Sequence, residues 1–333
     1  MVTIREIANK AGYSAATVSR LLNNDPTFSI AEQTKNKILQ VAMDLGYTGH
    51  DHQLPVRSIA IFFGITPKEE LEDVYYNGLR KSLKSSAEKL NMQISFYNNV
   101  SDLAPLANPI DGFIAVGNFK NETLKVLNNL SHNSIFIDSN PNPAFFSSVQ
   151  PDIEAITIDA IDQFRHCGYR NIGFIGGSYF NPNTNLPEMD QRERIFRNYL
   201  FELGLLQDKY IFSTGHFSVN TGYELGQRVI AQLDHDFPDG FFIASDPIAV
   251  GVLQAFNEHG ITVPKDTSII SVNNIDISKY VSPPLTTYDI NLNELSRTAI
   301  ELLNNNLLTH NKSHRRILIH SDLVIRRSFI PLN

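Results

Sequence analysis

The 333-residue sequence contains one cysteine and no tryptophan, and its apolar residues nowhere form a run long enough to cross a membrane. A single cysteine excludes an internal disulfide framework and leaves too few thiolates for a zinc cluster. A membrane-spanning helix would need about 18 or more consecutive apolar residues. The first six residues also lack the apolar core of a signal peptide, so we expect a soluble protein that stays in the cytoplasm.

Positive charge is scarce overall but not everywhere. The chain has 28 basic and 35 acidic side chains, a net charge of −7, which by itself disfavours binding to nucleic acid. Residues 1–60, however, carry six basic and five acidic groups, or +1, whereas the remainder carries 22 and 30, or −8. A near-neutral head on an acidic body is compatible with a small module that binds a polyanion, joined to a larger domain that repels one.

The first 47 residues predict three short helices. Thr3 and Glu6 have the spacing of a capping box, and apolar residues follow at helical intervals. Ser14 can cap a second helix after a turn of about three residues. Ser29 and Glu32 have the spacing of another capping box, which predicts a third helix. Two helices joined by a tight turn and followed by a third form a helix-turn-helix.

The outer face of the second helix is made of small and polar side chains. Ala15 and Ala16 permit a close approach to base edges, Thr17 and Ser19 can bond to phosphates, and Arg20 can contact a phosphate or a guanine. The same pattern would suit a helical hairpin that docks onto another protein. The residues alone therefore favour double-stranded DNA only modestly over a protein partner.

The rest of the chain has a different pattern. Residues 48–57 contain Gly49 and Pro55 and no apolar periodicity, which predicts a linker. From residue 58 onward, short β-rich runs such as Ile59 to Phe63 alternate with helical patterns, which is typical of an α/β fold with parallel sheets and crossover helices. About 270 residues exceed one comfortable core, so we expect two lobes with a cleft between them.

Specific motifs occur in both parts of the chain. The head contains VTIREIA at 2–8, AGYSAATVSRLLN at 11–23 and AMDLGY at 42–47, and the body contains GYRNIGFIGG at 168–177 and SDPIAVG at 245–251. With further matches at 111–114, 135–138, 260–270 and 283–287, the chain resembles LacI/GalR-type transcription regulators over almost its whole length. The resemblance implies a homodimer with an N-terminal all-α helix-turn-helix head and a two-lobed periplasmic-binding-protein-like core.

The domain boundaries follow from these two readings of the chain. Residues 1–47 are predicted to be the DNA-binding head, 48–57 a short linker and 58–333 the effector-binding and dimerisation core. Within the core we expect one lobe near residues 58–150 and 288–305. The other lobe is predicted near residues 151–287 and 306–333.

The resemblance also implies how the head meets DNA. Each head would place its second helix in the major groove of a half-site, and two-fold symmetry then predicts a near-palindromic operator. Relatives commonly have a longer segment before the core, with a hinge helix whose leucine enters the minor groove. Only 11 residues separate Tyr47 from Ile59 here, so no full hinge helix is expected. The DNA-facing candidates are Thr3, Ser14, Ala15, Ala16, Thr17, Arg20, Asn23, Ser29, Tyr47 and Leu54.

A small effector is implied for the cleft between the lobes. Carboxylate, amide and guanidinium groups bond to sugar hydroxyls, so a neutral sugar suits the matching positions. Arg194 is an alternative to Arg192, and the two tyrosines could instead fill an ordinary core. The effector-binding candidates are Tyr75, Tyr76, Asp138, Arg192, Asp246 and Asn273.

Two stretches narrow the expected function. Residues 68–76 and 23–29 resemble the branch that controls galactose or β-galactoside utilisation in Gram-positive bacteria, which implies a sugar-responsive repressor. The acidic residues at 69–72 equally suit a solvated helix terminus. We see no catalytic constellation, metal site or cofactor motif, and expect no enzyme. A cytoplasmic sugar-binding or sugar-modifying protein, and a regulator that uses a phosphoprotein corepressor, remain as alternatives.

Overall fold

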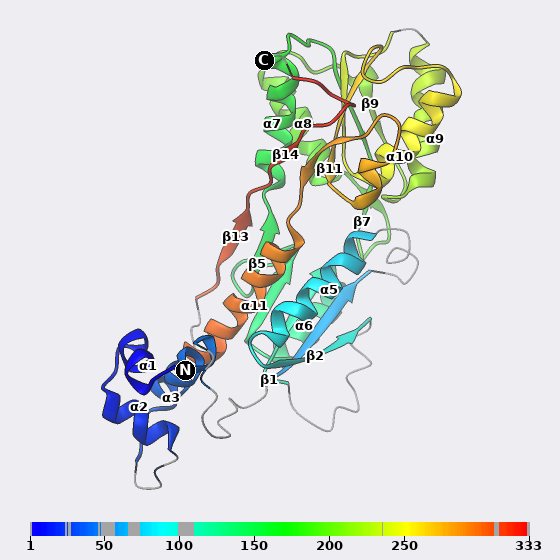
Figure 1. Ribbon diagram of the computed structural model, residues 1–333. Helices are drawn as coiled ribbons and strands as arrows, with labels where there is room; N and C mark the ends of the chain where they lie inside the picture. The colour runs from blue at the N-terminus through cyan, green and yellow to red at the C-terminus, as the bar shows by residue number, and fades with distance from the viewer. Residues whose placement is uncertain are drawn as a thin grey trace.

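The computed structural model shows a helical head and two α/β lobes that follow one another along the molecule (Figure 1). In the figure the head lies at the lower end, with the first lobe above it and the second lobe at the top. The residues that the structure describes are 2–23, 25, 28–45, 47, 57–65, 74–98, 110–234, 236–309 and 313–331.

The head contains the three helices that the sequence predicts: α1 (Ile4–Ala11), α2 (Ala15–Leu22) and α3 (Glu32–Asp44). The capping box of Thr3 and Glu6 is present, and the Ser14 hydroxyl accepts a hydrogen bond from the Thr17 N–H at 3.0 Å. The apolar faces of the three helices meet in a small buried core formed by Ile7, Ala8, Ala11, Val18, Leu21, Leu22, Ile38, Leu39 and Ala42.

The start of α3 differs from the prediction. The helix begins at Glu32, and the Ala31 carbonyl accepts the N–H of Lys35, so Ser29 lies outside the first turn. The helix therefore begins two residues later than a cap at Ser29 would place it. Ile30 packs against the core of the head instead, which holds the chain in place before the helix begins.

The first lobe contains a sheet of six described strands in the order β13-β5-β4-β3-β1-β2, and every neighbouring pair is parallel. All residues of the central strand β3 are buried, as expected where helices cover both faces of a parallel sheet. The elements are β1 (Arg57–Gly64), α5 (Val74–Glu88), β2 (Met92–Tyr97), β3 (Gly112–Gly117), α6 (Asn121–Leu130), β4 (Ser134–Ile137), β5 (Ser147–Pro151), α11 (Leu292–Thr309) and β13 (Arg316–Ile319).

The second lobe contains a sheet in the order β14-β12-β11-β10-β6-β9, parallel except where β14 pairs with β12. A short antiparallel hairpin, β7 (Tyr179–Phe180) with β8 (Pro187–Glu188), is separate from this sheet. The other elements are α7 (Ile153–His166), β6 (Ile172–Gly176), α8 (Gln191–Glu202), β9 (Ile211–Ser213), α9 (Val219–Leu233), β10 (Gly240–Ile243), α10 (Asp246–Glu258), β11 (Ser268–Asn273), β12 (Thr286–Asp289) and β14 (Leu323–Val324), with short 3₁₀ turns at Asp208–Tyr210 and Asp276–Lys279.

The chain crosses between the lobes after β5, after β12 and after β13 (Figure 1). The predicted placement of residues 306–333 in the second lobe needs correction, because α11 continues to Thr309 and β13 then pairs with β5 in the first sheet. β13 covers an edge of β5 that would otherwise expose unpaired backbone groups. Only the segment after Ile319 belongs to the second lobe.

The predicted strands of the body are present, beginning with Ile59 to Phe63 inside β1. Arg57, the last residue of the predicted linker, is already the first residue of this strand. Residues 48–56 of the linker, with Leu54, and residues 66–73 lie outside the described residues. No helix within the described ranges is both long and apolar enough to cross a bilayer.

Two glycines let α9 and α10 approach closely in the second lobe. A Cβ on Gly251 would lie 2.0 Å from the Val219 carbonyl oxygen, and a Cβ on Gly222 would lie 2.1 Å from the Ile248 carbonyl oxygen. Both obstacles are backbone atoms, so neither side can move away without separating the helices. These glycines therefore set the distance between the two helices.

We predict that Gly251→Ala lowers the free energy of unfolding by about 1–3 kcal/mol, because overpacking a tight contact forces the backbone to shift. Alanine forms helices better than glycine by about 1 kcal/mol, so helix propensity alone would predict a more stable variant. The steric clash predicts a less stable one. Chemical denaturation measures the change, with Gln254→Ala on the exposed face of α10 as the control. A variant as stable as the wild type would contradict the predicted clash.

Candidate functional site

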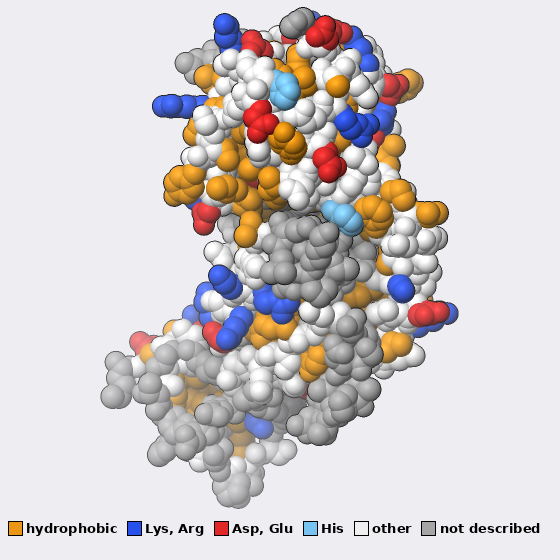
Figure 2. All heavy atoms as spheres, turned by 90° about the vertical axis from the view of Figure 1, so that its right-hand side faces the viewer, with side chains coloured by type: hydrophobic (Ala, Val, Ile, Leu, Met, Phe, Trp, Pro, Cys, Tyr) orange, Lys and Arg blue, Asp and Glu red, His pale blue; other side chains and the backbone are white. Residues whose placement is uncertain are grey.

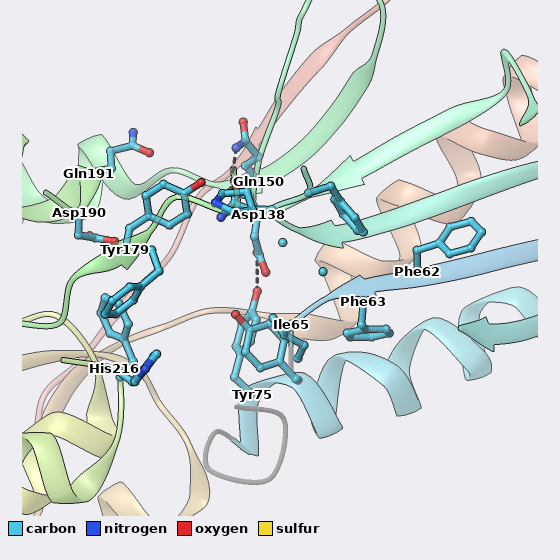
Figure 3. A pocket seen from close by; sticks show the side chains of 18 of the residues that line it. Phe62, Phe63, Ile65, Tyr75, Asp138, Gln150, Tyr179, Asp190, Gln191 and His216 are labelled. Atoms are coloured by element: carbon cyan, nitrogen blue, oxygen red, sulfur yellow. Dashed lines mark hydrogen bonds between the residues drawn. The ribbon is translucent and has the colours of Figure 1, made fainter. Parts of the chain in front are cut away.

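A cavity of about 990 Å³ lies between the two lobes, at the upper end of the range of about 300–1,000 Å³ for small-molecule sites. Asp138, directly after β4, and Asn273, at the end of β11, line it from opposite lobes. Parallel sheets bind ligands at this edge, where the carboxyl ends of their strands converge. Figure 3 shows Tyr75 and Asp138 of the first lobe across the cavity from Tyr179 and His216 of the second.

Aromatic side chains form one wall of the cavity in the first lobe. Tyr75 and Tyr76, at the start of α5, both line it and meet edge to face, with ring centroids 5.3 Å apart. Tyr76 also meets Phe63 of β1 edge to face at 6.5 Å. Tyr75 is almost fully buried and belongs to the core as well, so pocket lining and core packing are combined in this residue.

Asp138 is held by its neighbours in a defined position. The Tyr75 hydroxyl donates a hydrogen bond to Asp138 Oδ1 at 2.7 Å, and Gln150 Nε2 donates to the Asp138 carbonyl oxygen at 3.1 Å (Figure 3). Arg316 Nε in turn donates to Gln150 Oε1 at 3.0 Å. The backbone of Asp138 has φ 67°, a left-handed conformation that is uncommon for residues other than glycine and that clusters at functional sites.

Arg192 is a charged side chain that lines the cavity from the second lobe. Its Nε and Nη2 bind the two oxygens of Asp190 at 2.7 and 3.0 Å, its Nη1 donates to the Ala244 carbonyl, and its guanidinium lies 4.5 Å from the ring centroid of Phe217. Burial alone would raise the pKa of Asp190, but the charge and hydrogen bonds of Arg192 hold that pKa below its ordinary value. Arg194 is exposed on the same helix and does not line the cavity, so the structure favours Arg192 over this alternative.

Two more polar residues line the cavity from the second lobe. Asn273 does so as the sequence predicts, with a backbone φ of 116°. Ser245 was not predicted, yet its hydroxyl lies buried in the cavity wall without a hydrogen-bond partner among the described residues. It precedes α10 without using its side chain as a helix cap. A buried hydroxyl without a partner is costly, and because Ser245 lines the cavity, this residue is a further candidate to bind a ligand there.

Asp246 does not line the cavity, and the prediction that it binds the effector needs correction. The side chain is completely buried and its carboxylate accepts hydrogen bonds from the hydroxyls of Ser271 and Thr287 and from the Ile275 N–H. It ties the start of α10 to β11 and β12. Burial raises the pKa of Asp246 to about 6, against the opposing effect of these hydrogen bonds and of Arg326.

The β7–β8 hairpin was not predicted, and it lines part of the cavity. Phe180 stacks on His216 with ring centroids 4.7 Å apart, and both residues line the cavity with Tyr179. From the tip of the hairpin, Asn183 Oδ1 accepts the N–H of Asn121, the first residue of α6 in the other lobe, at 2.7 Å. The second lobe thereby supplies a side-chain cap to a helix of the first. Turn-forming residues such as Asn181 and Pro182 were the signal available in the sequence.

The cavity chemistry suits a neutral ligand with many hydroxyl groups. Carboxylate, amide, hydroxyl and guanidinium groups from both lobes can accept from and donate to such hydroxyls, and the aromatic wall can cover an apolar ring face. Among the described residues, no group of three or more His, Cys, Asp or Glu side chains is arranged to hold a metal ion.

The outer face of α2 is the second candidate site. Ala15, Ala16 and Arg20 are exposed there, and Thr17 is half-buried. Arg20 Nε binds Asp25 Oδ2 at 2.7 Å, and 47% of the arginine side chain remains accessible to solvent. The helix therefore offers two small residues and one arginine for contact with a flat or grooved partner.

The other DNA-facing candidates surround this helix or have structural partners in the head. Ser14 and Thr17 share a hydrogen bond between their hydroxyls, Thr3 bonds to Glu6, and Asn23 Nδ2 donates to Ser19 Oγ. Ser29 is exposed, and Tyr47 is half-buried against the core of the head. Figure 2 shows charged side chains of both signs scattered over the upper lobe, unlike a surface built for a polyanion.

The raised pKa of the buried Asp246 makes the stability of the protein depend on pH. Because its folded pKa of about 6 exceeds the unfolded value near 3.9, the folded state binds more protons between these limits. The contribution of this group to the free energy of unfolding is therefore lost as pH rises from about 4 to about 6. The loss is on the order of 3 kcal/mol.

We predict that Asp246→Asn removes this downward slope, because the amide does not titrate. Denaturation of both proteins between pH 4.5 and 7.5 measures it, with exposed Asp276→Asn as the control that keeps the slope. Lys279 lowers the pKa of Asp276, so its titration has the opposite sign. If the free energy of unfolding changed with pH in the same way in the wild type and in Asp246→Asn, the result would contradict a raised pKa of Asp246.

Comparisons with known proteins find matches to both the head and the body of the chain. Residues 3–49 match the family described as bacterial regulatory proteins, lacI family, and residues 161–329 match a periplasmic binding protein-like domain. The chain is 43% identical to the HTH-type transcriptional regulator GanR of Bacillus subtilis (strain 168), over 98% of this chain and 99% of that protein. It is 40% identical to the HTH-type transcriptional regulator LacR of Lactobacillus helveticus, over 99% of each.

Solved structures share the fold at lower identity. A complex of the transcriptional regulator CelR with cellobiose has a TM-score of 0.69 at 18% identity and covers 99% of this chain and 100% of that one. A lac repressor dimer bound to operator and the anti-inducer ONPF has a TM-score of 0.68 at 21% identity, with 98% of both chains covered. The match of the head and the identity to relatives along the whole chain establish that the protein belongs to the LacI family of DNA-binding transcriptional regulators.

Proposed function

We propose that this regulator is a homodimeric repressor of sugar-utilisation genes, controlled by a small neutral sugar of the galactose or β-galactoside class. The observation that carries the proposal is the cavity between the lobes, where polar groups from both sides surround an aromatic wall. The solved relative that holds cellobiose supports a carbohydrate as the ligand class. The galactose class rests on the resemblance of residues 23–29 and 68–76.

Each polar group has a role in holding the sugar. Asp138 accepts sugar hydroxyls and Arg192 donates to them, while Ser245 and Asn273 satisfy hydroxyls on the side of the second lobe. Tyr75 and Tyr76 cover the sugar ring. Because Asp190 binds the same guanidinium in a bidentate pair, Arg192 keeps its orientation before the ligand arrives.

A ligand that contacts both lobes biases their relative position. It stabilises the arrangement in which both sets of contacts form, and its differential affinity for the two arrangements is what couples binding to DNA affinity. α11 begins two residues after Ile290, which lines the cavity, and its far end lies near α3 of the head. This helix of 18 residues, about 27 Å long, connects the two sites mechanically.

The head contacts the operator through α2. Ala15 and Ala16 approach base edges, Arg20 reads a guanine and the polar residues around them contact the phosphates. Two heads related by two-fold symmetry recognise a near-palindromic site. The operator-bound lac repressor dimer, which shares the fold, supports this arrangement.

We predict that a galactose-class sugar raises the melting temperature of the purified protein, since a ligand that binds only the folded state stabilises it by about 2.7 kcal/mol at 100 times its dissociation constant. Galactose, lactose, galactobiose and sugar phosphates form the panel for a thermal-shift assay. Asp138→Ala and Arg192→Lys should abolish the shift or reduce it severely. Arg194→Lys, the same change outside the cavity, should leave it intact.

A shift that persists in Asp138→Ala and Arg192→Lys would remove the cavity from the proposal. A panel in which no sugar changes the melting temperature would remove the sugar class. Turnover of any sugar by the protein would favour a sugar-modifying enzyme instead. A shift that appears only with an added phosphoprotein would favour a protein corepressor.

We predict that Arg20→Ala weakens binding to a near-palindromic operator fragment by about 5- to 150-fold, because the loss of a bidentate base contact costs about 1–3 kcal/mol. The sugar-induced thermal shift should not change, since the head is remote from the cavity. Fluorescence anisotropy at two salt concentrations measures the affinity. Lys10→Ala removes the same charge from α1 and should cost only the general electrostatic attraction; equal losses in the two variants would argue against base reading by Arg20.

A further inference from the structure

The loop after α2 folds back onto the arginine of the DNA-facing helix. The Asp25 N–H donates to the Arg20 carbonyl at 3.1 Å, and the Phe28 N–H donates to the Asp25 carbonyl at 3.0 Å. These two backbone bonds bring Asp25 and Phe28 beside Arg20. Neither residue belongs to the DNA-facing candidates of the sequence analysis.

Both side chains contact the guanidinium group. Asp25 Oδ2 accepts from Arg20 Nε at 2.7 Å, and the guanidinium carbon lies 4.7 Å from the centroid of the Phe28 ring. Phe28 itself packs against the core of the head, so its ring cannot move freely. The carboxylate thus fixes one edge of the guanidinium plane, while the ring fixes one of its faces.

Stability does not explain this arrangement. The ion pair is exposed, with 47% of the Arg20 and 29% of the Asp25 side chain accessible, and such pairs contribute little to folding. A carboxylate next to a DNA-facing surface also repels phosphates. The benefit that offsets this repulsion is orientation, because an arginine otherwise loses much rotamer freedom when it binds.

The contacted atom is informative about what Arg20 reads. Asp25 binds Nε, and the terminal edge of Nη1 and Nη2 is an edge that matches guanine O6 and N7 in the major groove. We propose that Asp25 and Phe28 are positioning residues that hold the Arg20 guanidinium for one guanine in each half-site. The inference rests on the proposed operator binding and assigns a role to the 23–29 stretch that resembles the galactoside branch.

A positioning role for Asp25 and Phe28 affects the preference for one base and not the overall affinity for DNA. Removal of the Asp25 charge lessens phosphate repulsion, so binding to non-cognate DNA should stay the same or tighten, while the preference for guanine falls. A purely structural role predicts the opposite, since a damaged head would bind every sequence less well. Discrimination at one base position is therefore the readout that distinguishes the two roles.

The experiment uses the full-length protein and a pool of duplex DNA with randomised, near-palindromic half-sites. Wild type, Arg20→Ala, Asp25→Asn and Phe28→Leu are each selected on the pool, and Asp44→Asn serves as a control that removes the same charge from the exposed end of α3. Dissociation constants are then measured on the selected site and on the same site with the guanine changed to adenine in both halves.

We expect the wild type and Asp44→Asn to prefer the guanine by about tenfold or more, and Asp25→Asn and Phe28→Leu to prefer it less than about threefold. The loss should be confined to the position at which Arg20→Ala also loses its preference. Full preference in either Asp25→Asn or Phe28→Leu, or a loss spread over all positions, would overturn the proposal while leaving operator binding in place. If the wild type selects no site at all, the proposed function itself fails.

Discussion

Parallel strand pairing is the constraint on which the cavity depends. A parallel pair needs a long crossover, usually a helix, so all strands of such a sheet end at the same edge. In this protein the two edges face each other, and they present Asp138 after β4 and Asn273 at the end of β11. Both residues turn the chain with positive φ, which aspartate and asparagine tolerate better than bulkier residues. The residues that end strands are therefore also the residues that face the ligand space.

Two contacts beyond the three crossing segments connect parts of the molecule: one joins the two lobes, and the other joins the first lobe to the head. Asn183 from the hairpin of the second lobe caps α6 of the first, so a hydrogen bond between described residues joins the two lobes beside the cavity. α11 starts at the crossing beside the cavity and extends toward α3. One hydrogen bond contributes little net free energy, whereas a packed helix moves as a unit. The two contacts therefore differ in kind: a hydrogen bond joins the lobes, and a packed helix extends from the first lobe toward the head.

Adjacent side chains in the second lobe have opposite roles. Asp246 has an ionisable carboxylate, whereas Ser245 has only a hydroxyl. The Asp246 carboxylate is nevertheless enclosed by Ser271, Thr287 and the Ile275 N–H. Ser245, one residue earlier, lines the cavity and has a buried hydroxyl without a hydrogen-bond partner among the described residues. In the head, Asp25 likewise matters through its contact with Arg20 rather than through its own exposure. In each case the direction of the side chain decides its role, and adjacent residues at a strand or helix end differ in direction.

The sequence by itself determined the local elements: the caps at Thr3 and Ser14, the apolar stripes of the head and the strands of the body, because each depends on residues only a few positions apart. It also indicated five of the residues that line the cavity, Tyr75, Tyr76, Asp138, Arg192 and Asn273, which lie at strand ends or helix starts. Only the tertiary structure decided that β13 completes the first sheet, that the β7–β8 hairpin reaches the opposite lobe and that Ser245 rather than Asp246 lines the cavity. Those outcomes depend on register and on contacts between residues far apart in the chain, for which no local pattern carries a signal.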